Sequence, residues 1–176
     1  MTDSDDFKAR REALSDKGSI AEFGGCVWTY WDGGPGRDQV ESDLERWGEP
    51  NEDPVAIEHL ENLIELAENG GLLRSNFKAP CGAMTGRLVG PWIGELKSQG
   101  MKSRGNEGTR AYRLYFAEVP LVGPSLLAAK LAWKCSKWTD EVTETNQTSQ
   151  IASAMGITRA HARTGDGTYR EVDWSL

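Results

Sequence analysis

Three short strand-like runs in the third quarter of the chain constrain the fold more than any other feature. They cover residues 92–97, 110–116 and 126–134, and Gly, Pro or Ser residues bound each of them. Runs that lie so close together in sequence tend to pair as an antiparallel meander. We therefore expect this meander to be the centre of the fold.

Alternation along the three runs predicts one apolar and one charged face for the meander. The residues expected in the core are Trp92, Leu96, Tyr112, Leu114, Phe116, Leu127, Leu131 and Trp133. The residues expected on the opposite face are Glu95, Lys97, Arg113, Tyr115, Lys130 and Lys134. An ordinary solvated face explains any single lysine, but strands favour β-branched residues over Lys and Glu. The whole set therefore predicts an open, basic, concave surface.

The first half of the chain predicts a strand and a helical hairpin. A β-branched and aromatic run at 24–31 is typical of a strand, and an apolar spacing of helical period follows at 37–47. Asp53-Pro54 reads as an N-cap followed by the first residue of a second helix, which Gly70-Gly71 ends. We expect the hairpin to bury Leu44, Leu60 and Ile64 on the sheet.

The rest of the chain divides into a charged N-terminal extension (1–22), one folded domain (23–163) and a C-terminal tail (164–176). Residues 72–89 fit either a hairpin or a loop, and a short helix is expected at about 148–162. Tyr169, Val172 and Trp174 alternate, so the tail can also add an edge strand.

Charge is distributed unevenly along the chain, whose net charge is −7. Residues 20–69 carry thirteen acids and two bases, whereas residues 70–164 carry thirteen bases and six acids. This asymmetry favours an anionic partner for the basic half, although the two halves can also simply neutralise each other. No apolar run is long enough to span a membrane, and no secretory signal is evident. The three cysteines have no metal-site spacing, so we expect reduced thiols, a cytoplasmic protein, and neither a metal nor a cofactor.

Several short motifs in this order resemble the RelE/ParE toxin superfamily, nearest to its HigB-like, often phage-derived branch. They are Leu72-Leu-Arg74, Trp92-x-x-Glu-Leu-Lys97, Arg110-Ala-Tyr-Arg-Leu-Tyr-Phe116, the 126–134 run and the Thr-rich 137–151 stretch. The resemblance covers about residues 28–163 and implies an α+β fold. In that fold a helical hairpin packs on a twisted, mostly antiparallel sheet that is followed by a short C-terminal helix.

The resemblance implies a toxin that cleaves mRNA on the ribosome, inhibits translation and growth, and is neutralised by a helix-turn-helix antitoxin. Two alternatives remain open. One is a catalytically inert relative, such as a phage or prophage effector, that binds and inhibits a host protein. The other is a relative directed at gyrase.

Metal-free RNA cleavage needs a base for the 2′-hydroxyl, cations for the phosphorane and an acid for the leaving oxygen. The resemblance assigns Arg113 to the scissile phosphate, with Lys134 as a further cation and Glu95 or Tyr115 for proton transfer. The residues expected to contact RNA phosphates are Lys97, Lys102, Arg104, Arg110, Lys130 and Lys137. On an open face, Arg113→Ala is expected to abolish activity and leave stability nearly unchanged.

Overall fold

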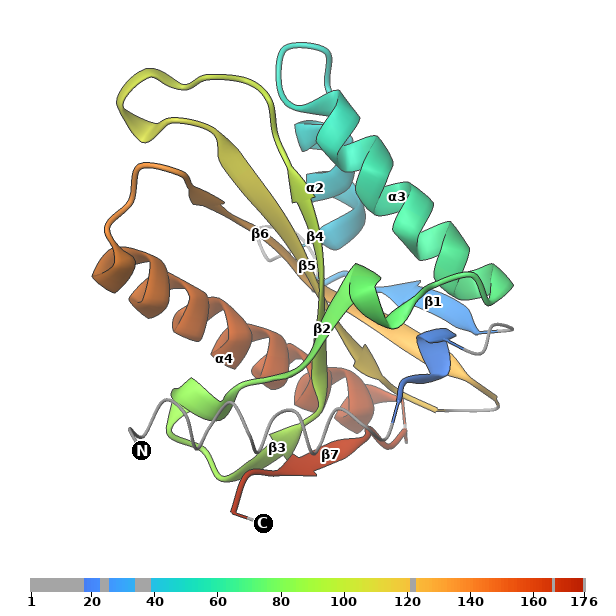
Figure 1. The fold of residues 1–176 in the computed structure, drawn as a ribbon. Helices are drawn as coiled ribbons and strands as arrows, with labels where there is room; N and C mark the ends of the chain where they lie inside the picture. The colour runs from blue at the N-terminus through green and yellow to red at the C-terminus, as the bar shows by residue number, and fades with distance from the viewer. Residues whose placement is uncertain (1–17, 23–25, 34–38, 121–122, 166, 176) are drawn as a thin grey trace.

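The structure, a computed structural model, describes residues 18–22, 26–33, 39–120, 123–165 and 167–175. It has an α+β fold in which helices lie on both faces of a mostly antiparallel five-stranded sheet (Figure 1). The expected class and sheet type are therefore confirmed. The elements are η1 (Ile20–Glu22), β1 (Val27–Tyr30), α2 (Val40–Trp47), α3 (Pro54–Asn69), η2 (Arg74–Asn76), β2 (Phe77–Cys81), η3 (Ala83–Thr85), β3 (Val89–Pro91), β4 (Ile93–Gln99), η4 (Gly105–Glu107), β5 (Arg110–Glu118), β6 (Ser125–Cys135), α4 (Asp140–Thr164) and β7 (Glu171–Asp173).

The five-stranded sheet has the strand order β1-β6-β5-β4-β2. The strands β4, β5 and β6 form the expected antiparallel meander, with Leu96 opposite Leu114 and Tyr112 opposite Trp133. β1 pairs with β6 in parallel, and β2 joins the other edge antiparallel to β4. The stretch that the sequence left undecided therefore contributes the outer strand β2.

The helices α2 and α3 cover one face of this sheet and enclose the larger hydrophobic core. α3 begins at Pro54 and ends at Gly70, whose φ of 77° requires the left-handed conformation that glycine adopts readily. At the centre of this core the ring of Phe116 makes edge contacts with Trp28, Trp92 and Phe77, at centroid distances of 5.5, 5.8 and 6.1 Å. Such offset ring pairs add to the stabilisation that burial itself provides.

Gly94 lies directly opposite Phe116, so closely that a β-carbon on residue 94 would overlap the aromatic ring. We expect Gly94→Ala to lower the free energy of unfolding by about 1–3 kcal/mol, measured by urea denaturation. Gly156→Ala is the matched control, because a β-carbon there meets nothing within 4 Å on the exposed side of α4. That change is expected to stabilise the protein by up to about 1 kcal/mol. Equal stability of Gly94→Ala and the native chain would contradict this packing.

The helix α4 covers the opposite face of the sheet and is much longer than expected. It spans 25 residues and begins at Asp140 rather than near residue 148, because the Thr139 hydroxyl caps it by accepting a hydrogen bond from the Val142 N–H. Its C-terminal half carries Ile151, Ala154 and Met155 into a second core. The expectation of a short C-terminal helix is therefore wrong.

A β-bulge in β6 changes which residues enter which core. Tyr115 pairs with Lys130 but Phe116 pairs with Ala128, so Ala129 is an extra residue on β6. The alternation shifts by one residue there, and Leu127 faces the second core while Leu131 faces the first. The expectation that these two leucines share a face is wrong. Trp133 is only partly buried, at the margin of the first core.

Both ends of the described chain are tied to the domain. The Glu118 carboxylate accepts hydrogen bonds from the Ser19 hydroxyl at 2.8 Å, the Ile20 N–H at 3.0 Å and the Arg170 guanidinium at 3.0 Å. β7 pairs with β3, and Trp174 beyond it is 1% exposed in the first core. Residues 1–17 of the predicted N-terminal extension lie outside the described residues. In the described part of the chain, no helix has the length and apolar character needed to cross a membrane.

Candidate nucleic-acid interface

One face of the sheet carries the charged side chains that alternation predicted. The register places Glu95 opposite Tyr115, Tyr115 opposite Lys130, and Lys97 opposite Arg113. Residues that pair directly across strands project from the same face. Lys134, opposite Ala111, joins them, and β2 adds Lys78 opposite Glu95. We call these seven residues the charged face: Lys78, Glu95, Lys97, Arg113, Tyr115, Lys130 and Lys134.

The charged face is not the open surface that the sequence predicted, because α4 lies across it. The apolar half of α4 packs on Tyr115, which is fully buried. The polar half lies over the charged residues, where the Gln147 amide donates a hydrogen bond of 3.2 Å to Glu95. Glu95 is 0% exposed and Arg113 6% exposed. The expectation of a solvent-exposed Arg113 and Tyr115 is therefore wrong.

A buried ion pair forms the centre of the charged face. The Arg113 guanidinium donates from Nη1 to Glu95 Oε2 at 2.7 Å, and the Lys97 ammonium lies 3.3 Å from Glu95 Oε1. The Lys97 side chain is 53% exposed, so it links the pair to solvent. The Arg113 Nε–H is buried and has no hydrogen-bond partner among the described residues. The Arg113 Nε–H can thus donate a hydrogen bond to an anion that enters beside Lys97.

The Tyr115 hydroxyl is buried beside the same pair and also lacks a hydrogen-bond partner within the described residues. Burial, and after it the negative charge of Glu95, raise the pKa of Tyr115 well above its ordinary value. The side chain is therefore a neutral phenol at physiological pH and cannot remove a proton from a substrate, and its raised pKa also makes it a weak proton donor in this conformation.

The accessible cations of the charged face lie at the end of the sheet where the meander extends beyond the apolar half of α4. There Lys97, Arg113 and Lys134 line a hollow of about 610 Å³ together with Gln99 and Ala111. Within the described residues, no group of three or more His, Cys, Asp or Glu side chains could hold a metal ion. The Lys97 and Lys134 ammonium groups make the hollow suited to a bound anion, and Val55, His59 and Met101 also line it.

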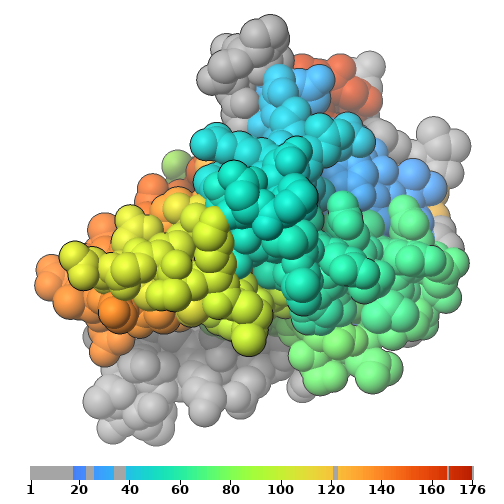
Figure 2. Space-filling model, turned by 90° about the horizontal axis from the view of Figure 1, so that it is seen from above, coloured from blue at the N-terminus to red at the C-terminus, as the bar shows by residue number. Residues whose placement is uncertain are grey.

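The other cations predicted to contact RNA lie around the loop of residues 100–109, away from the centre of the charged face. Arg104 forms ion pairs with Glu52 at 2.6 Å and Asp53 at 3.0 Å, and Figure 2 shows this loop (yellow) packed against the α2–α3 turn (cyan). Arg110 lies over the rings of Trp47 and Trp133, 4.8 and 4.0 Å from their centroids. Lys102 and Lys137 are exposed, and the Lys137 ammonium donates to the Gly105 carbonyl.

Asp53 is the buried acceptor that fastens this loop. Its Oδ2 accepts from the Tyr112 hydroxyl at 2.7 Å and from Arg104, while Oδ1 accepts from the Lys102 N–H at 3.1 Å. Asp53 stands at the N-cap position of α3, as predicted, but its side chain makes no capping hydrogen bond. Burial alone lowers the pKa of Arg104, but the hydrogen bonds that Arg104 donates to Asp53 and Glu52 outweigh it and raise the pKa above its ordinary value. Arg104 is therefore a structural cation in this conformation.

Sequence reasoning missed two contributors to the charged face. Lys78 was overlooked because residues 72–89 gave no clear strand pattern, and the register shift of β2 between Lys78 and Cys81 explains why. Gln147 was overlooked because its helix turn is polar on every side. Comparison of the chain with known protein families, curated proteins and solved structures finds no match.

Proposed function

We propose that this chain is a RelE/ParE-like, HigB-like toxin that binds mRNA on the ribosome, cleaves it and so inhibits translation and growth. The observation that carries the proposal is the gathering of five cations around one carboxylate on a single sheet face, established by the strand register. The succession of strand, helical hairpin, antiparallel meander and C-terminal helix also fits the fold that the resemblance implies.

In this proposal the exposed Lys97 and the half-buried Lys134 attract the RNA backbone into the hollow at the end of the sheet. Arg113 donates its unpaired Nε–H to the scissile phosphate. Because the phosphate then competes with Glu95 for the Arg113 guanidinium, Glu95 accepts the 2′-hydroxyl proton. The P–O5′ bond breaks as the 2′-oxygen bonds to phosphorus, and Tyr115 is the proposed proton donor to the departing 5′-oxygen. Lys102, Arg110, Lys130 and Lys137 act as peripheral positive charge, and a helix-turn-helix antitoxin neutralises the protein.

A second candidate is a catalytically inert relative that binds and inhibits a host protein. One observation favours it: the proton-transfer groups are engaged or buried, since Glu95 is held by Arg113, Gln147 and Lys97 and Tyr115 is fully buried. A cleaving enzyme then needs the polar half of α4 to lift from the sheet, whereas a binding protein does not. A gyrase-directed relative belongs to the same group of protein-binding alternatives.

The test is expression in bacteria with primer-extension mapping of transcripts, for the native chain and for the Lys97→Ala/Lys134→Ala double variant. We expect growth inhibition and mapped cleavage by the native chain, and a loss of cleavage rate of about 10²-fold or more in the double variant. Arg87→Ala/Arg163→Ala removes the same charge from exposed positions elsewhere and is expected to retain cleavage at close to the native rate.

The outcomes separate the two candidates. Growth inhibition with intact transcripts would contradict the endonuclease and favour the protein-binding alternative. Cleavage that both double variants retain equally would show that the charged face is not the RNA site. Thermal unfolding of each variant, expected to match the native chain, confirms that lost activity does not reflect lost structure.

A further inference from the structure

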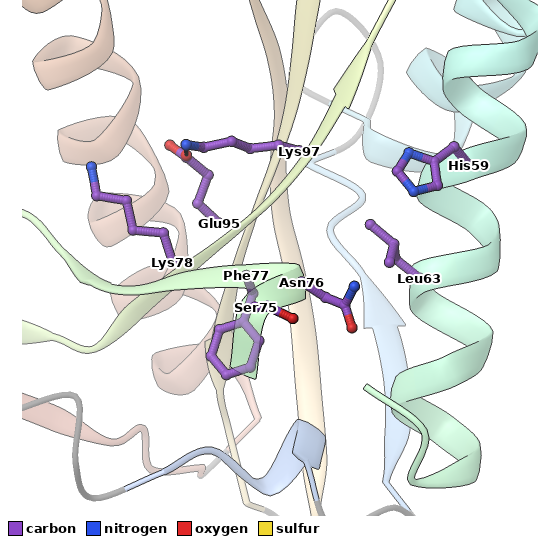
Figure 3. Close-up of a pocket in the computed structure, with 8 residues that line it drawn as sticks. All are labelled: His59, Leu63, Ser75, Asn76, Phe77, Lys78, Glu95 and Lys97. Atoms are coloured by element: carbon purple, nitrogen blue, oxygen red, sulfur yellow. Dashed lines mark ion pairs between the residues drawn. The ribbon is translucent and has the colours of Figure 1, made fainter. Parts of the chain in front are cut away.

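A serine and a histidine are in hydrogen-bond contact where the end of β4 meets α3. His59 Nδ1 lies 3.1 Å from the Ser98 hydroxyl oxygen. Ser98 pairs with Tyr112, so its side chain projects toward the helical hairpin, on the opposite side of the sheet from Lys97. Figure 3 shows His59 directed from α3 toward β4, while Lys97 and Glu95 extend to the other side. The Ser98–His59 pair is therefore separate from the charged face.

The contact places a base beside an alcohol. When His59 carries its hydrogen on Nε2, its Nδ1 accepts the hydrogen bond from the Ser98 hydroxyl. A neutral imidazole in this position can take the hydroxyl proton and so make the serine oxygen a nucleophile. Because one side chain is held by a helix and the other by a strand, their separation is fixed by regular backbone.

The residue after Ser98 adds a backbone donor. The Gly100 N–H donates to the Arg110 carbonyl at 2.7 Å, which makes 100 and 110 a hydrogen-bonded pair. Such pairs alternate along antiparallel strands, so Gln99 directs its N–H away from β5. On that side β2 pairs with β4 only as far as Leu96, and no described strand residue lies opposite Gln99. An N–H directly after a nucleophilic serine is a common donor to the oxyanion in acyl transfer.

These groups line the hollow of about 610 Å³ at the end of the sheet. His59, Ser98 and Gln99 all contribute to its wall, and its volume is in the range of small-molecule sites. Ser98 is 6% exposed, so a ligand must enter the hollow to reach its hydroxyl. Val55 and Met101 line the same hollow and are 68% and 81% exposed, which leaves apolar surface for a ligand to cover.

The substrate class follows from the two kinds of lining. Apolar surface from Val55 and Met101 suits a hydrocarbon group, and the Lys97 and Lys134 ammonium groups suit an anion. A matching substrate carries an apolar group on one side of a reactive carbonyl and a negative charge on the other. An ester that joins a short apolar acyl chain to an anionic alcohol has this arrangement.

We propose that Ser98 and His59 form a catalytic dyad that hydrolyses such esters. The Ser98 oxygen bonds to the carbonyl carbon while its proton passes to His59 Nδ1, and the Gln99 N–H donates to the oxyanion. The bond from this carbon to the alcohol oxygen then breaks, and His59 returns the proton to the departing alcohol. Water attacks the acyl-serine in the same way, giving a proton to His59 that returns to the Ser98 oxygen as the acid leaves. This activity does not depend on the proposed function.

The first test is covalent labelling of the native chain with a fluorophosphonate, which phosphonylates an activated serine oxygen and releases fluoride. Peptide mapping by mass spectrometry is expected to place the label on Ser98. His59→Gln should slow labelling by about 10²-fold or more, because the base is lost. His161→Gln alters the other histidine, which lies against Trp31, and should label at the native rate. No label on Ser98, or equal labelling rates of the native chain and His59→Gln, would overturn the dyad.

The second test is ester hydrolysis, with the butanoate ester of hydroxynitrobenzoate as the anionic probe and para-nitrophenyl butanoate as the neutral one. Ser98→Ala is expected to lower kcat/KM for both esters by about 10²-fold or more. Lys97→Gln should raise KM for the anionic ester three- to tenfold, and more than for the neutral ester. Arg87→Gln, an exposed cation outside the hollow, is the control and should match the native chain. Equal hydrolysis by the native chain and Ser98→Ala would overturn the proposal.

A hydrogen bond that only fastened α3 to β4 would affect stability and not chemistry. Ser98→Cys separates these roles, because it retains a nucleophile of similar size. Incubation with para-nitrophenyl butanoate is expected to add one butanoyl group to residue 98 of this variant, detected by mass, and none in Ser98→Cys/His59→Gln over the same time. Equal acylation of the two variants would show that His59 does not act as a base. Because no RNA or ribosome is present, failure of these tests and failure of the transcript-cleavage test are independent.

Discussion

Replacement of Arg113 by alanine is expected to lower the free energy of unfolding by about 3–5 kcal/mol. The change removes the Nη1–H that donates a hydrogen bond of 2.7 Å to the Glu95 carboxylate, and Glu95 is 0% exposed. The Gln147 amide and the half-exposed Lys97 ammonium remain, but neither replaces a buried guanidinium. An uncompensated buried charge accounts for most of the expected loss. Urea denaturation monitored by tryptophan fluorescence measures it.

Joint replacement of both members of the ion pair separates the cost of an unpaired buried charge from the packing of the arginine side chain. We expect Arg113→Met/Glu95→Leu to be markedly more stable than Arg113→Ala, because a buried ion pair can be replaced by apolar groups at little cost. Lys97→Met, which removes only the exposed cation, is expected to cost less than about 1 kcal/mol. If Arg113→Ala costs less than about 1 kcal/mol, the guanidinium is not buried under α4.

This expectation reverses the one that the sequence supports, and the reason is physical. Alternation with a period of two correctly places Glu95, Lys97 and Arg113 on one face, because that period follows from strand geometry alone. It carries no information about what covers the face. The covering helix turn around Gln147 is polar on both sides, since it contacts a charged sheet below and water above. It therefore lacks the apolar stripe by which a packed helix is recognised.

The bulge in β6 illustrates a different limit. Residues 126–132 are nearly all Leu and Ala, and both sides of the sheet are buried there, so either alternation satisfies the local pattern. The extra residue at Ala129 is determined by pairing with β5 and packing against two helical layers. Leu114 and Phe116 lie in β5, whose own alternation is regular because the extra residue belongs to β6. Their place in the first core was predicted correctly.

Asp53 shows how a local signal can be correct in position and wrong in role. Asp-Pro predicts the start of a helix, and α3 does begin there. The carboxylate, however, binds Tyr112 and Arg104, which are distant in sequence and reach it only after the meander has formed. Three long-range hydrogen bonds from a hydroxyl, a guanidinium and a backbone N–H outweigh one local capping bond.

Replacement of Asp53 by alanine is therefore expected to lower the free energy of unfolding by about 3–5 kcal/mol. Asp53 is 4% exposed, and its loss leaves the Tyr112 hydroxyl and the inner side of Arg104 without their acceptor. Tyr112→Phe removes only the hydroxyl donor and is expected to cost about 0.5–1.5 kcal/mol. Glu49→Ala, an exposed acid on the same turn, is the control and should change stability by less than about 0.5 kcal/mol.

The stabilisation that Asp53 and Tyr112 provide is expected to depend on pH, in a direction that follows from their shifted pKa values. Burial raises the pKa of Asp53, but hydrogen bonds from Tyr112 and Arg104 outweigh it and hold the pKa below its ordinary value. The unfolded chain then binds more protons than the folded chain as pH falls below about 4, so the stabilisation by Asp53 is present above that pH and is lost below it. Burial and the hydrogen bond to Asp53 raise the pKa of Tyr112 to about 12. The Tyr112 contribution is thus complete below about pH 10 and is lost as the pH rises to about 12.

Stability curves of the native chain and Asp53→Ala are accordingly expected to lie farthest apart between about pH 5 and 9 and to converge below about pH 3. Tyr112→Phe should remove the alkaline decline that belongs to residue 112 and leave most of the acid decline in place. A difference between the native chain and Asp53→Ala that stayed constant down to pH 2 would contradict an ionised, hydrogen-bonded Asp53. It would instead indicate that the alanine acts through lost packing at the start of α3.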